Sequence, residues 1–443
     1  MKRALLLVAV AVLAACIHGP LSWSPDGKRF VFAGLLEDDR GQSDRGGLYV
    51  FDVDDGSVTR PVVSDVGMST PVFLDDSRIL YAVPSTSDRP TVKLMTVDRE
   101  TKRRRPLCFL ALKGPGSEED VESTAGLIVP SLSEDRTRAV FSVVQAKSPP
   151  LVLLADLLSR TVTVLPAAGM FPSLSPDGER VTFLAMPGAG TSVLEVGPPT
   201  THAMKGVIDL SGFASGADEP RVSGLAVYDV EREQVSLPIR WKGRLDAPVT
   251  ATNRAGNLYA LAGRRGVVLF DLETKRAQEL LPKEELRRVT FARDDRSLMA
   301  VLAGRQMKEL AGALVRIAPD GGVEAVYGGA HTLDIAAFGL APDRRTFATV
   351  HTHPKVRDPL AVLHDLSTGR PARVLLPELD SATDLVKRWS FLLWGAEEAE
   401  LLTFDRAFKM VEARVGALEA DDENREVYAT RLAQAREGRF QGR

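Results

Sequence analysis

Four histidines lie close together in the last third of the chain and are the side chains best suited to metal chemistry. They are His331, His351, His353 and His364. His351-Thr352-His353 on a strand would place two imidazoles on one face, because strand side chains alternate with period two. A zinc or copper site needs three or four converging ligands, which His364 with Asp358 or Asp365 would complete. The spacing of these residues is not diagnostic of a metal site, so the favoured interpretation is that the histidines form hydrogen bonds at the surface, and no cofactor is expected. A metal site at His351, His353 and His364 is the alternative.

Other catalytic and nucleotide-binding motifs are missing from the sequence. A serine peptidase needs a nucleophile elbow, G-x-S-x-G, and the nearest segment, Gly212-Phe213-Ala214-Ser215-Gly216, has its serine one place too late. The sequence contains neither a phosphate-binding G-x-x-x-x-G-K-(S/T) loop nor a G-x-G-x-x-G motif. Asp52–Gly56 and Pro319–Gly322 lack the ligand series of a calcium loop, so hairpin turns are predicted there. These observations favour a binding protein over an enzyme.

The N-terminus has the pattern of a secretory signal. Lys2 and Arg3 precede an uninterrupted apolar run over residues 4–15. A transmembrane helix needs about 20 apolar residues, so this run is too short to span a bilayer but suits the apolar region of a signal peptide. Residues 1–15 are therefore predicted to be removed from the mature protein.

The residues around Cys16 carry a more specific signal. Leu13-Ala14-Ala15-Cys16 resembles the lipobox of bacterial lipoprotein precursors. The resemblance implies cleavage before Cys16 and acylation of its thiol, which would anchor the chain to a membrane. The residue after it is Ile17 rather than an aspartate, which in such lipoproteins favours the outer membrane, on its periplasmic side or at the cell surface. The only other cysteine is Cys108, so no intramolecular disulfide is expected.

The charge balance argues against a nucleic-acid partner. Loss of Lys2 and Arg3 with the signal peptide changes the formal net charge from −3 to −5. Charges of both signs are mixed along the chain, without the long basic stripe that a nucleic-acid binder needs. The densest basic run, Lys102–Arg105, follows an apolar strand pattern and is interpreted as a solvated hairpin turn.

An internal repeat organises most of the remaining chain. The segment Trp23–Phe32, WSPDGKRFVF, returns as Leu174–Phe183, LSPDGERVTF. Weaker copies are LDDSRILYA from Leu74, SEDRTRAVF from Ser133, NRAGNLYAL from Asn253, ARDDRSLMA from Ala292 and APDRRTFAT from Ala341, and a faint eighth is WGAEEAELLTF from Trp394. Successive copies lie about 40 to 60 residues apart with one longer interval, a period typical of propeller blades.

Each repeat predicts a tight hairpin at the start of a four-stranded unit. Proline presets φ for the turn, aspartate bonds its own backbone, and glycine takes the left-handed position. These positions are Pro25, Asp26 and Gly27 in the first copy and Pro176, Asp177 and Gly178 in the fourth. Further apolar runs follow most copies, such as Gly47–Val53 and Val267–Leu272. Each unit therefore reads as four antiparallel strands.

The repeat resembles that of the TolB-like, WD-related propeller family, whose blades carry a W-S-P-D-G-(K/E)-R-apolar-x-F pattern on the first hairpin. The resemblance implies an all-β fold, a seven- or eight-bladed β-propeller of four-stranded antiparallel blades. The family includes periplasmic binding subunits and the propeller halves of prolyl-oligopeptidase-like peptidases, so the fold alone does not select a function.

The predicted organisation has four parts. Residues 1–15 form the signal peptide, 16–20 the lipidated N-terminus and linker, 21–416 the propeller, and 417–443 a helical or frayed tail. Two segments interrupt the repeat. Gly188–Pro220, rich in Gly, Pro, Ser and Thr, is interpreted as a long loop or small hairpin that projects from one rim of the fourth blade and need not contribute to the shared core. Lys113–Glu122 is interpreted as a linker.

Two functional hypotheses follow from the sequence. The favoured one is a lipid-anchored envelope propeller that presents its rim or central channel to an envelope protein, as a binding or scaffold module without nucleic acid. The alternative is a metal-dependent propeller hydrolase or lyase that uses the histidines of the seventh blade.

Overall fold

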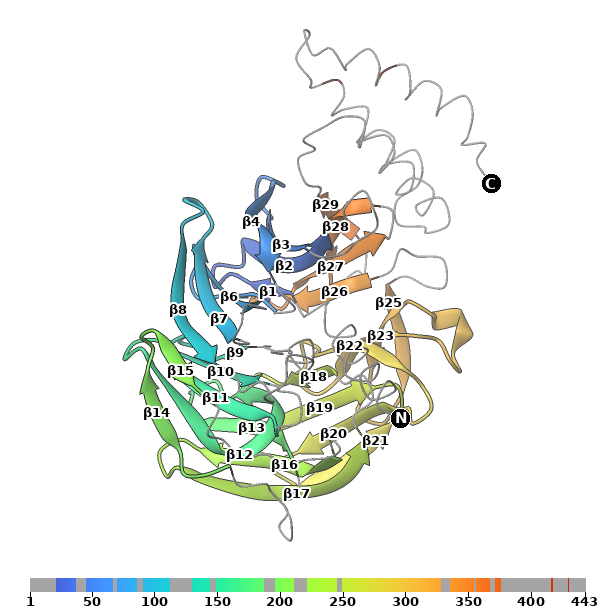
Figure 1. Ribbon diagram of the computed structural model, residues 1–443. Helices are drawn as coiled ribbons and strands as arrows, with labels where there is room; N and C mark the ends of the chain where they lie inside the picture. The colour runs from blue at the N-terminus through green and yellow to red at the C-terminus, as the bar shows by residue number, and fades with distance from the viewer. Residues whose placement is uncertain are drawn as a thin grey trace, which may run out of the picture.

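The computed structural model is an all-β structure whose strands form four-stranded antiparallel blades around a common axis (Figure 1). The residues described are 21–36, 45–66, 70–85, 91–111, 130–143, 149–186, 196–210, 221–244, 249–327, 335–353, 356–366 and 371–375, with Gly416 and Ala429. Within these residues there are seven blades, so the predicted β-propeller is confirmed. No helix in the described part of the chain is long and apolar enough to cross a bilayer.

The strands of the first three blades follow one another along the chain, and those of blade 4 are interrupted by β14 (Thr200–Ala203) and β15 (Val207–Asp209). Blade 1 contains β1 (Ser22–Trp23), β2 (Arg29–Leu36), β3 (Arg45–Asp52) and β4 (Val58–Val66). Blade 2 contains β5 (Val72–Phe73), β6 (Arg78–Ser85), β7 (Thr91–Asp98) and β8 (Arg104–Ala111). Blade 3 contains β9 (Ser131–Leu132), β10 (Arg138–Val143), β11 (Leu151–Asp156) and β12 (Thr161–Leu174). Blade 4 contains the end of β12, β13 (Arg180–Ala185), β16 (Arg221–Asp229) and β17 (Gln234–Arg244).

The last three blades are equally regular. Blade 5 contains β18 (Val249–Thr252), β19 (Leu258–Gly263), β20 (Gly266–Asp271) and β21 (Arg276–Leu280). Blade 6 contains β22 (Leu286–Phe291), β23 (Leu298–Leu302), β24 (Leu314–Ile317) and β25 (Val323–Tyr327), with the short 3-10 helix η2 (Lys308–Leu310) between β23 and β24. Blade 7 contains β26 (Ile335–Leu340), β27 (Thr346–His353), β28 (Val356–Asp365) and β29 (Pro371–Leu375).

The core lies between the blades, because each sheet buries both of its faces. On β2 the buried Phe30 and Phe32 pack against blade 7, whereas Val31 between them packs against blade 2. Alternate strand residues point to opposite faces, so one strand supplies apolar side chains to two interfaces. Seven hydrophobic clusters in the described residues fill the seven junctions between neighbouring blades, including that between blades 7 and 1.

The junction between the last and first blades closes the ring by side-chain packing. Trp23 is 6% exposed, and its indole Nε1 donates to the carbonyl oxygen of Gly339 in blade 7 at 3.2 Å. Its ring lies against Phe30, which is stacked on Phe51. In the described residues blades 1 and 7 are each made of four consecutive strands, so hydrophobic contact rather than strand exchange joins them.

The repeat residues form the predicted hairpin turn between the first two strands. In the first copy the Ser24 hydroxyl donates to the Asp26 carboxylate at 2.5 Å, and that carboxylate accepts the Lys28 N–H at 2.9 Å. Gly27 has a φ of 70° and donates its N–H to the Ser24 carbonyl at 3.0 Å. The fourth copy repeats this geometry, with Gly178 at a φ of 73°. These turn positions therefore build the backbone of the fold.

Substitution of Gly178 by valine should lower the free energy of unfolding by about 1–2 kcal/mol. A β-branched side chain is strained at a φ of 73°, and a Cβ there would lie 3.2 Å from the Cδ of Arg138. Urea denaturation followed by circular dichroism measures the change. The same substitution at Gly322, whose φ is not positive, is the control, and equal losses from both variants would contradict the role given to the left-handed turn.

The interpretation of Gly188–Pro220 as a long loop or small hairpin that projects from the rim is wrong for its described part, residues 196–210, which pairs with two other blades and contributes to the core. β14 (Thr200–Ala203) pairs with the outer edge of β12 in blade 3. β15 (Val207–Asp209) then pairs in parallel with β8 of blade 2, from Phe109 to Ala111. The segment leaves blade 4 and covers the outer edges of two neighbouring blades, because unpaired edge strands offer free backbone hydrogen-bonding groups. We call residues 196–210 the strap.

Several predicted features lie outside the described residues. These are the signal peptide, Cys16, the linker Lys113–Glu122, the faint eighth repeat from Trp394, and the tail over 417–443 apart from Ala429. The hairpins expected at Asp52–Gly56 and Pro319–Gly322 are confirmed, as turns between β3 and β4 and between β24 and β25.

Candidate functional site: a pocket between blades 6 and 7

The two rims of the propeller differ in their connections. One rim carries the repeat turns, such as residues 24–29 and 175–180, and also the turns between the third and fourth strands of each blade. We call it the turn rim. The opposite rim carries the connections between the second and third strands, such as Arg264–Arg265, and the crossings between blades. We call it the entry rim, because Leu21 precedes β1 on that side.

The repeat turns contact one another around the turn rim. The Asp26 N–H donates to Asp76 of the next turn at 3.0 Å, and the Glu134 N–H donates to the Pro176 carbonyl at 2.8 Å. Arg254 reaches past a whole blade, with its guanidinium 2.7 Å from the Glu134 carboxylate. The turns thus form a continuous inner ring that fixes the blades relative to one another.

Asp295 connects three blades within this ring. Its carboxylate accepts the N–H groups of Arg254 and Ala255 in blade 5 at 2.9 and 3.1 Å, and it pairs with Arg344 of blade 7 at 2.9 Å. Burial alone would raise the pKa of the Asp295 carboxyl, but these hydrogen bonds and the Arg344 guanidinium lower it below its ordinary value. Asp295 is therefore held as a carboxylate.

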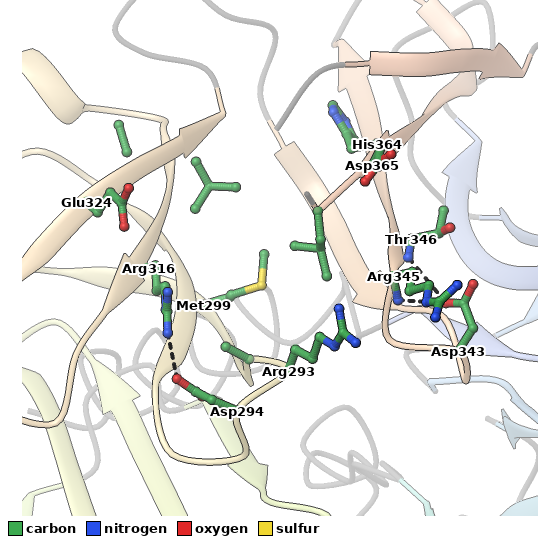
Figure 2. Close-up of a pocket in the computed structure, with 14 residues that line it drawn as sticks. Arg293, Asp294, Met299, Arg316, Glu324, Asp343, Arg345, Thr346, His364 and Asp365 are labelled. Carbon is green, nitrogen blue, oxygen red and sulfur yellow. Dashed lines mark hydrogen bonds and ion pairs between the residues drawn. The ribbon is translucent and has the colours of Figure 1, made fainter. Parts of the chain in front are cut away.

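Outside this ring, a pocket of about 1260 Å³ opens on the turn rim between blades 6 and 7. Figure 2 shows the side chains that line it. They are Ala292, Arg293, Asp294, Met299, Arg316, Glu324, Ala325, Val326, Asp343, Arg345, Thr346, His364, Asp365 and Leu366. Blade 6 supplies one wall from β22 to β25, and blade 7 supplies the other from its repeat turn and the end of β28.

The mouth of the pocket carries charges of both signs. Arg293 comes from the repeat turn of blade 6 and Arg345 from that of blade 7, and both are exposed (Figure 2). Glu324 and Asp365 lie farther out along their blades and are also exposed. Such a mouth suits a ligand that itself carries charged groups, as the surface of a protein does.

An ion pair stiffens the blade 6 wall. The Arg316 guanidinium lies 2.6 Å from the Asp294 carboxylate, which also accepts the hydroxyl and N–H of Ser297. Burial opposes ionisation of Asp294, but its hydrogen bonds from Ser297, Arg296 and Arg316 outweigh it and lower the pKa of the carboxyl well below its usual range. This carboxylate is therefore held within the blade 6 wall by Arg316 and Ser297.

Behind the mouth the pocket becomes apolar. Met299, Val326 and Leu366 line it, together with the fully buried His364. The imidazole of His364 is stacked on Phe347, with centroids 4.4 Å apart, and lies 4.2 Å from the Tyr327 ring. Its Nε2 lies 2.9 Å from the Thr349 hydroxyl. His364 is thus part of the packing between blades 6 and 7.

The backbone register places His351 away from this stack. His351 pairs with Leu360 on β27, whereas His364 pairs with Phe347, four residues along the same strand, or about 13 Å. The side chains of His351 and His353 lie outside the described residues, as does His331. Among the described residues no three His, Cys, Asp or Glu side chains come together as metal ligands.

Cys108 is not a reactive thiol. It lies on β8 in the junction between blades 2 and 3 and is 1% exposed. Burial raises the pKa of its thiol to about 11, so the thiol is protonated at neutral pH. The residue acts as a small apolar side chain of the core.

Of the pocket residues, sequence reasoning singled out only His364 and Asp365, and it named them as candidate metal ligands. Arg293–Asp294 and Asp343–Arg345 lie in corresponding repeat copies, ARDD and APDRR, of adjacent blades. Adjacent blades place these two copies side by side, and this arrangement is the signal from which the pocket residues in the two turns could have been identified. The outer residues Arg316, Glu324 and Asp365 carry no motif and are joined to the site only by the packing of the blades.

Similarity to known proteins is found among solved structures. The sequence matches no family model and no curated protein. Among solved structures the chain is similar to the β-propeller domain of the Trilobed protease from Pyrococcus furiosus, at 8% identity and a TM-score of 0.48, over 79% of this chain and 94% of that one. It is similar to the periplasmic gluconolactonase PpgL of Pseudomonas aeruginosa, at 16% identity and a TM-score of 0.46, over 78% and 94%. It is also similar to TolB from Acinetobacter baumannii, at 15% identity and a TM-score of 0.40, over 77% and 78%.

Proposed function

We propose that this protein is a lipid-anchored module of the bacterial envelope that binds a protein partner at its turn rim. The observation that carries the binding role is the pocket between blades 6 and 7. It is large, opens on a rigid rim, and combines an apolar interior with a charged mouth. Protein interfaces use the same combination, in which an apolar anchor enters a pocket and charges at the edge select the partner.

The rigidity of the rim supports this role. The repeat turns on both sides of the pocket are tied together by Arg344, which bonds to Asp295 at 2.9 Å and to the Arg293 carbonyl at 3.2 Å. A preformed site loses little conformational entropy on binding. The proposed anchor rests on the sequence Leu13–Cys16. Acylation of Cys16 would hold the propeller at the membrane and concentrate it near an envelope partner.

One experiment tests both parts of the proposal. The wild type, Cys16→Ser and Arg345→Glu are expressed with a C-terminal tag, and envelopes are fractionated before and after detergent solubilisation. We expect Cys16→Ser to move to the soluble fraction, because it cannot be acylated. We expect Arg345→Glu to remain in the membrane but to retain at least tenfold less of the partner that the wild type captures, because the variant reverses a charge at the pocket mouth.

Arg296→Glu is the matched control for the pocket. Arg296 is exposed on the repeat turn of blade 6, which also carries the pocket residue Arg293, but Arg296 does not line the pocket, and its substitution makes the same charge change. Capture that falls equally in Arg296→Glu and Arg345→Glu would contradict the pocket as the binding site. Equal membrane retention of wild type and Cys16→Ser would contradict the lipid anchor.

A further inference from the structure

The entry rim of blades 5 and 6 carries a group of exposed basic side chains. They are Arg264 and Arg265 in the turn between β19 and β20, Lys283 after β21, Arg287 on β22, and Arg305 and Lys308 between β23 and β24. We call these six residues the basic face. They lie on the rim opposite the pocket, so they belong to a different surface.

The three loops that carry the basic face are in contact. The Arg305 guanidinium lies 2.6 Å from the Glu285 carboxylate, and the Arg287 Nε lies 3.9 Å from it. The Ala303 N–H donates to the Glu285 carbonyl at 2.8 Å. A Cβ on Gly266 would lie 2.3 Å from the Leu281 carbonyl oxygen, so the turn between β19 and β20 abuts the loop after β21. The six side chains thus share one continuous surface.

Positive charge predominates on this surface. Residues 263–266, 281–288 and 303–309 contain seven basic residues and three acidic ones, Glu284, Glu285 and Glu309, a net charge of +4. Glu284 is 2% exposed, and its carboxylate accepts the N–H groups of Arg305, Gln306 and Met307 at 2.6, 2.9 and 3.1 Å. Glu284 therefore stabilises the loop from within and is not an acidic group of the exposed surface. The whole chain is negative, so this face contrasts with the rest of the molecule.

The basic face is held in a fixed shape. Glu284 pins the start of the loop, and the half-buried Met307 and Leu310 pack against the core between blades 5 and 6. Because these loops are ordered, their basic side chains can all interact with one flat partner at the same time.

The path of the chain gives a second, independent argument. β1 runs toward the repeat turn at residues 24–29, so the chain reaches Leu21 from the entry-rim side. Cys16 is five residues earlier, and five residues span at most about 17 Å. If Cys16 is acylated, as the proposed function requires, the bilayer lies next to the entry rim.

We propose that the basic face rests on the anionic headgroups of a phospholipid bilayer. Lysine and arginine close to an anionic membrane are attracted to it, and the attraction decays within a Debye length of about 8–10 Å. The entry rim would then face the membrane, and the turn rim with its pocket would point away from it toward the partner.

Vesicle sedimentation tests this interaction without the acyl chains. Mature protein carrying Cys16→Ser is mixed with vesicles of phosphatidylcholine alone or with phosphatidylglycerol added. We expect it to sediment with the anionic vesicles only, and to be released when the salt concentration is raised. Adding Lys283→Glu and Lys308→Glu should reduce partitioning by at least tenfold, since each basic residue near the surface contributes about a fivefold factor.

Arg103→Glu with Arg104→Glu on the turn rim is the matched control, with the same change in charge at exposed residues. An equal loss in this control, or absence of binding to the anionic vesicles, would overturn the proposal. Equally tight binding to soluble polyglutamate would assign the face to an acidic protein and overturn it as well. Because every protein in the assay lacks Cys16, the result is independent of acylation, which the membrane fractionation of Cys16→Ser tests separately.

Discussion

Replacement of Ile208 by alanine is expected to lower the free energy of unfolding by about 2–5 kcal/mol, the usual cost of truncating a fully buried isoleucine. Ile208 is the central residue of β15 in the strap and is 3% exposed. Its side chain belongs to the cluster between blades 2 and 3, which also contains Met204 and Leu210 from the strap. The truncation would leave a cavity beneath an edge strand of only three residues.

Val207 provides the control for this prediction. It precedes Ile208 on β15 but points outward and is 64% exposed. Val207→Ala should change the stability by less than about 1 kcal/mol, because little apolar area is lost. Urea denaturation of the two variants measures the difference. If both variants unfold at the same urea concentration as the wild type, the strap does not contribute to the core, and its pairing with β8 and β12 is wrong.

Asp295→Ala is expected to destabilise the protein by about 2–4 kcal/mol, because three groups on two other blades lose their shared acceptor. The N–H groups of Arg254 and Ala255 and the guanidinium of Arg344 all bond to this carboxylate. The residue also has a φ of 61°, which aspartate tolerates better than alanine. Asp320→Ala is the control, since Asp320 accepts one N–H, from Gly322, in an exposed turn.

The effect of Asp295 should depend on pH. The pKa of its carboxyl is lower in the folded protein, so the carboxylate contributes stability above the unfolded value of about 3.9, and this contribution is lost as the pH falls toward the folded pKa. The stability difference between wild type and Asp295→Asn should therefore be larger at pH 7 than at pH 3. A difference that stays constant over this range would show that the charge of Asp295 does not hold the blades together.

The sequence predicted the blades because their signals are local. Turn chemistry such as Ser24-Pro25-Asp26-Gly27 and alternating apolar runs such as Gly47–Val53 act over about ten residues, and the repeat showed that these units recur. Apart from the faint eighth copy from Trp394, which lies outside the described residues, the structure confirms a hairpin at every copy of the repeat. The anchor at Cys16 is likewise a prediction from contiguous residues, which the fractionation of Cys16→Ser tests.

Tertiary structure alone decided the features that depend on residues distant in the sequence. β15 is three residues long and shows no strand pattern, and only the open edge of β8 gives it a pairing partner. The pocket forms where the repeat turns of blades 6 and 7 lie side by side. The basic face forms where loops of blades 5 and 6 are in contact. His364, which the sequence named only in the alternative metal site, is stacked on Phe347 and packs against the tilted ring of Tyr327. Local chemistry specifies turns and strands, whereas a pocket, a charged face or the role of a histidine is set by neighbours that only packing brings together.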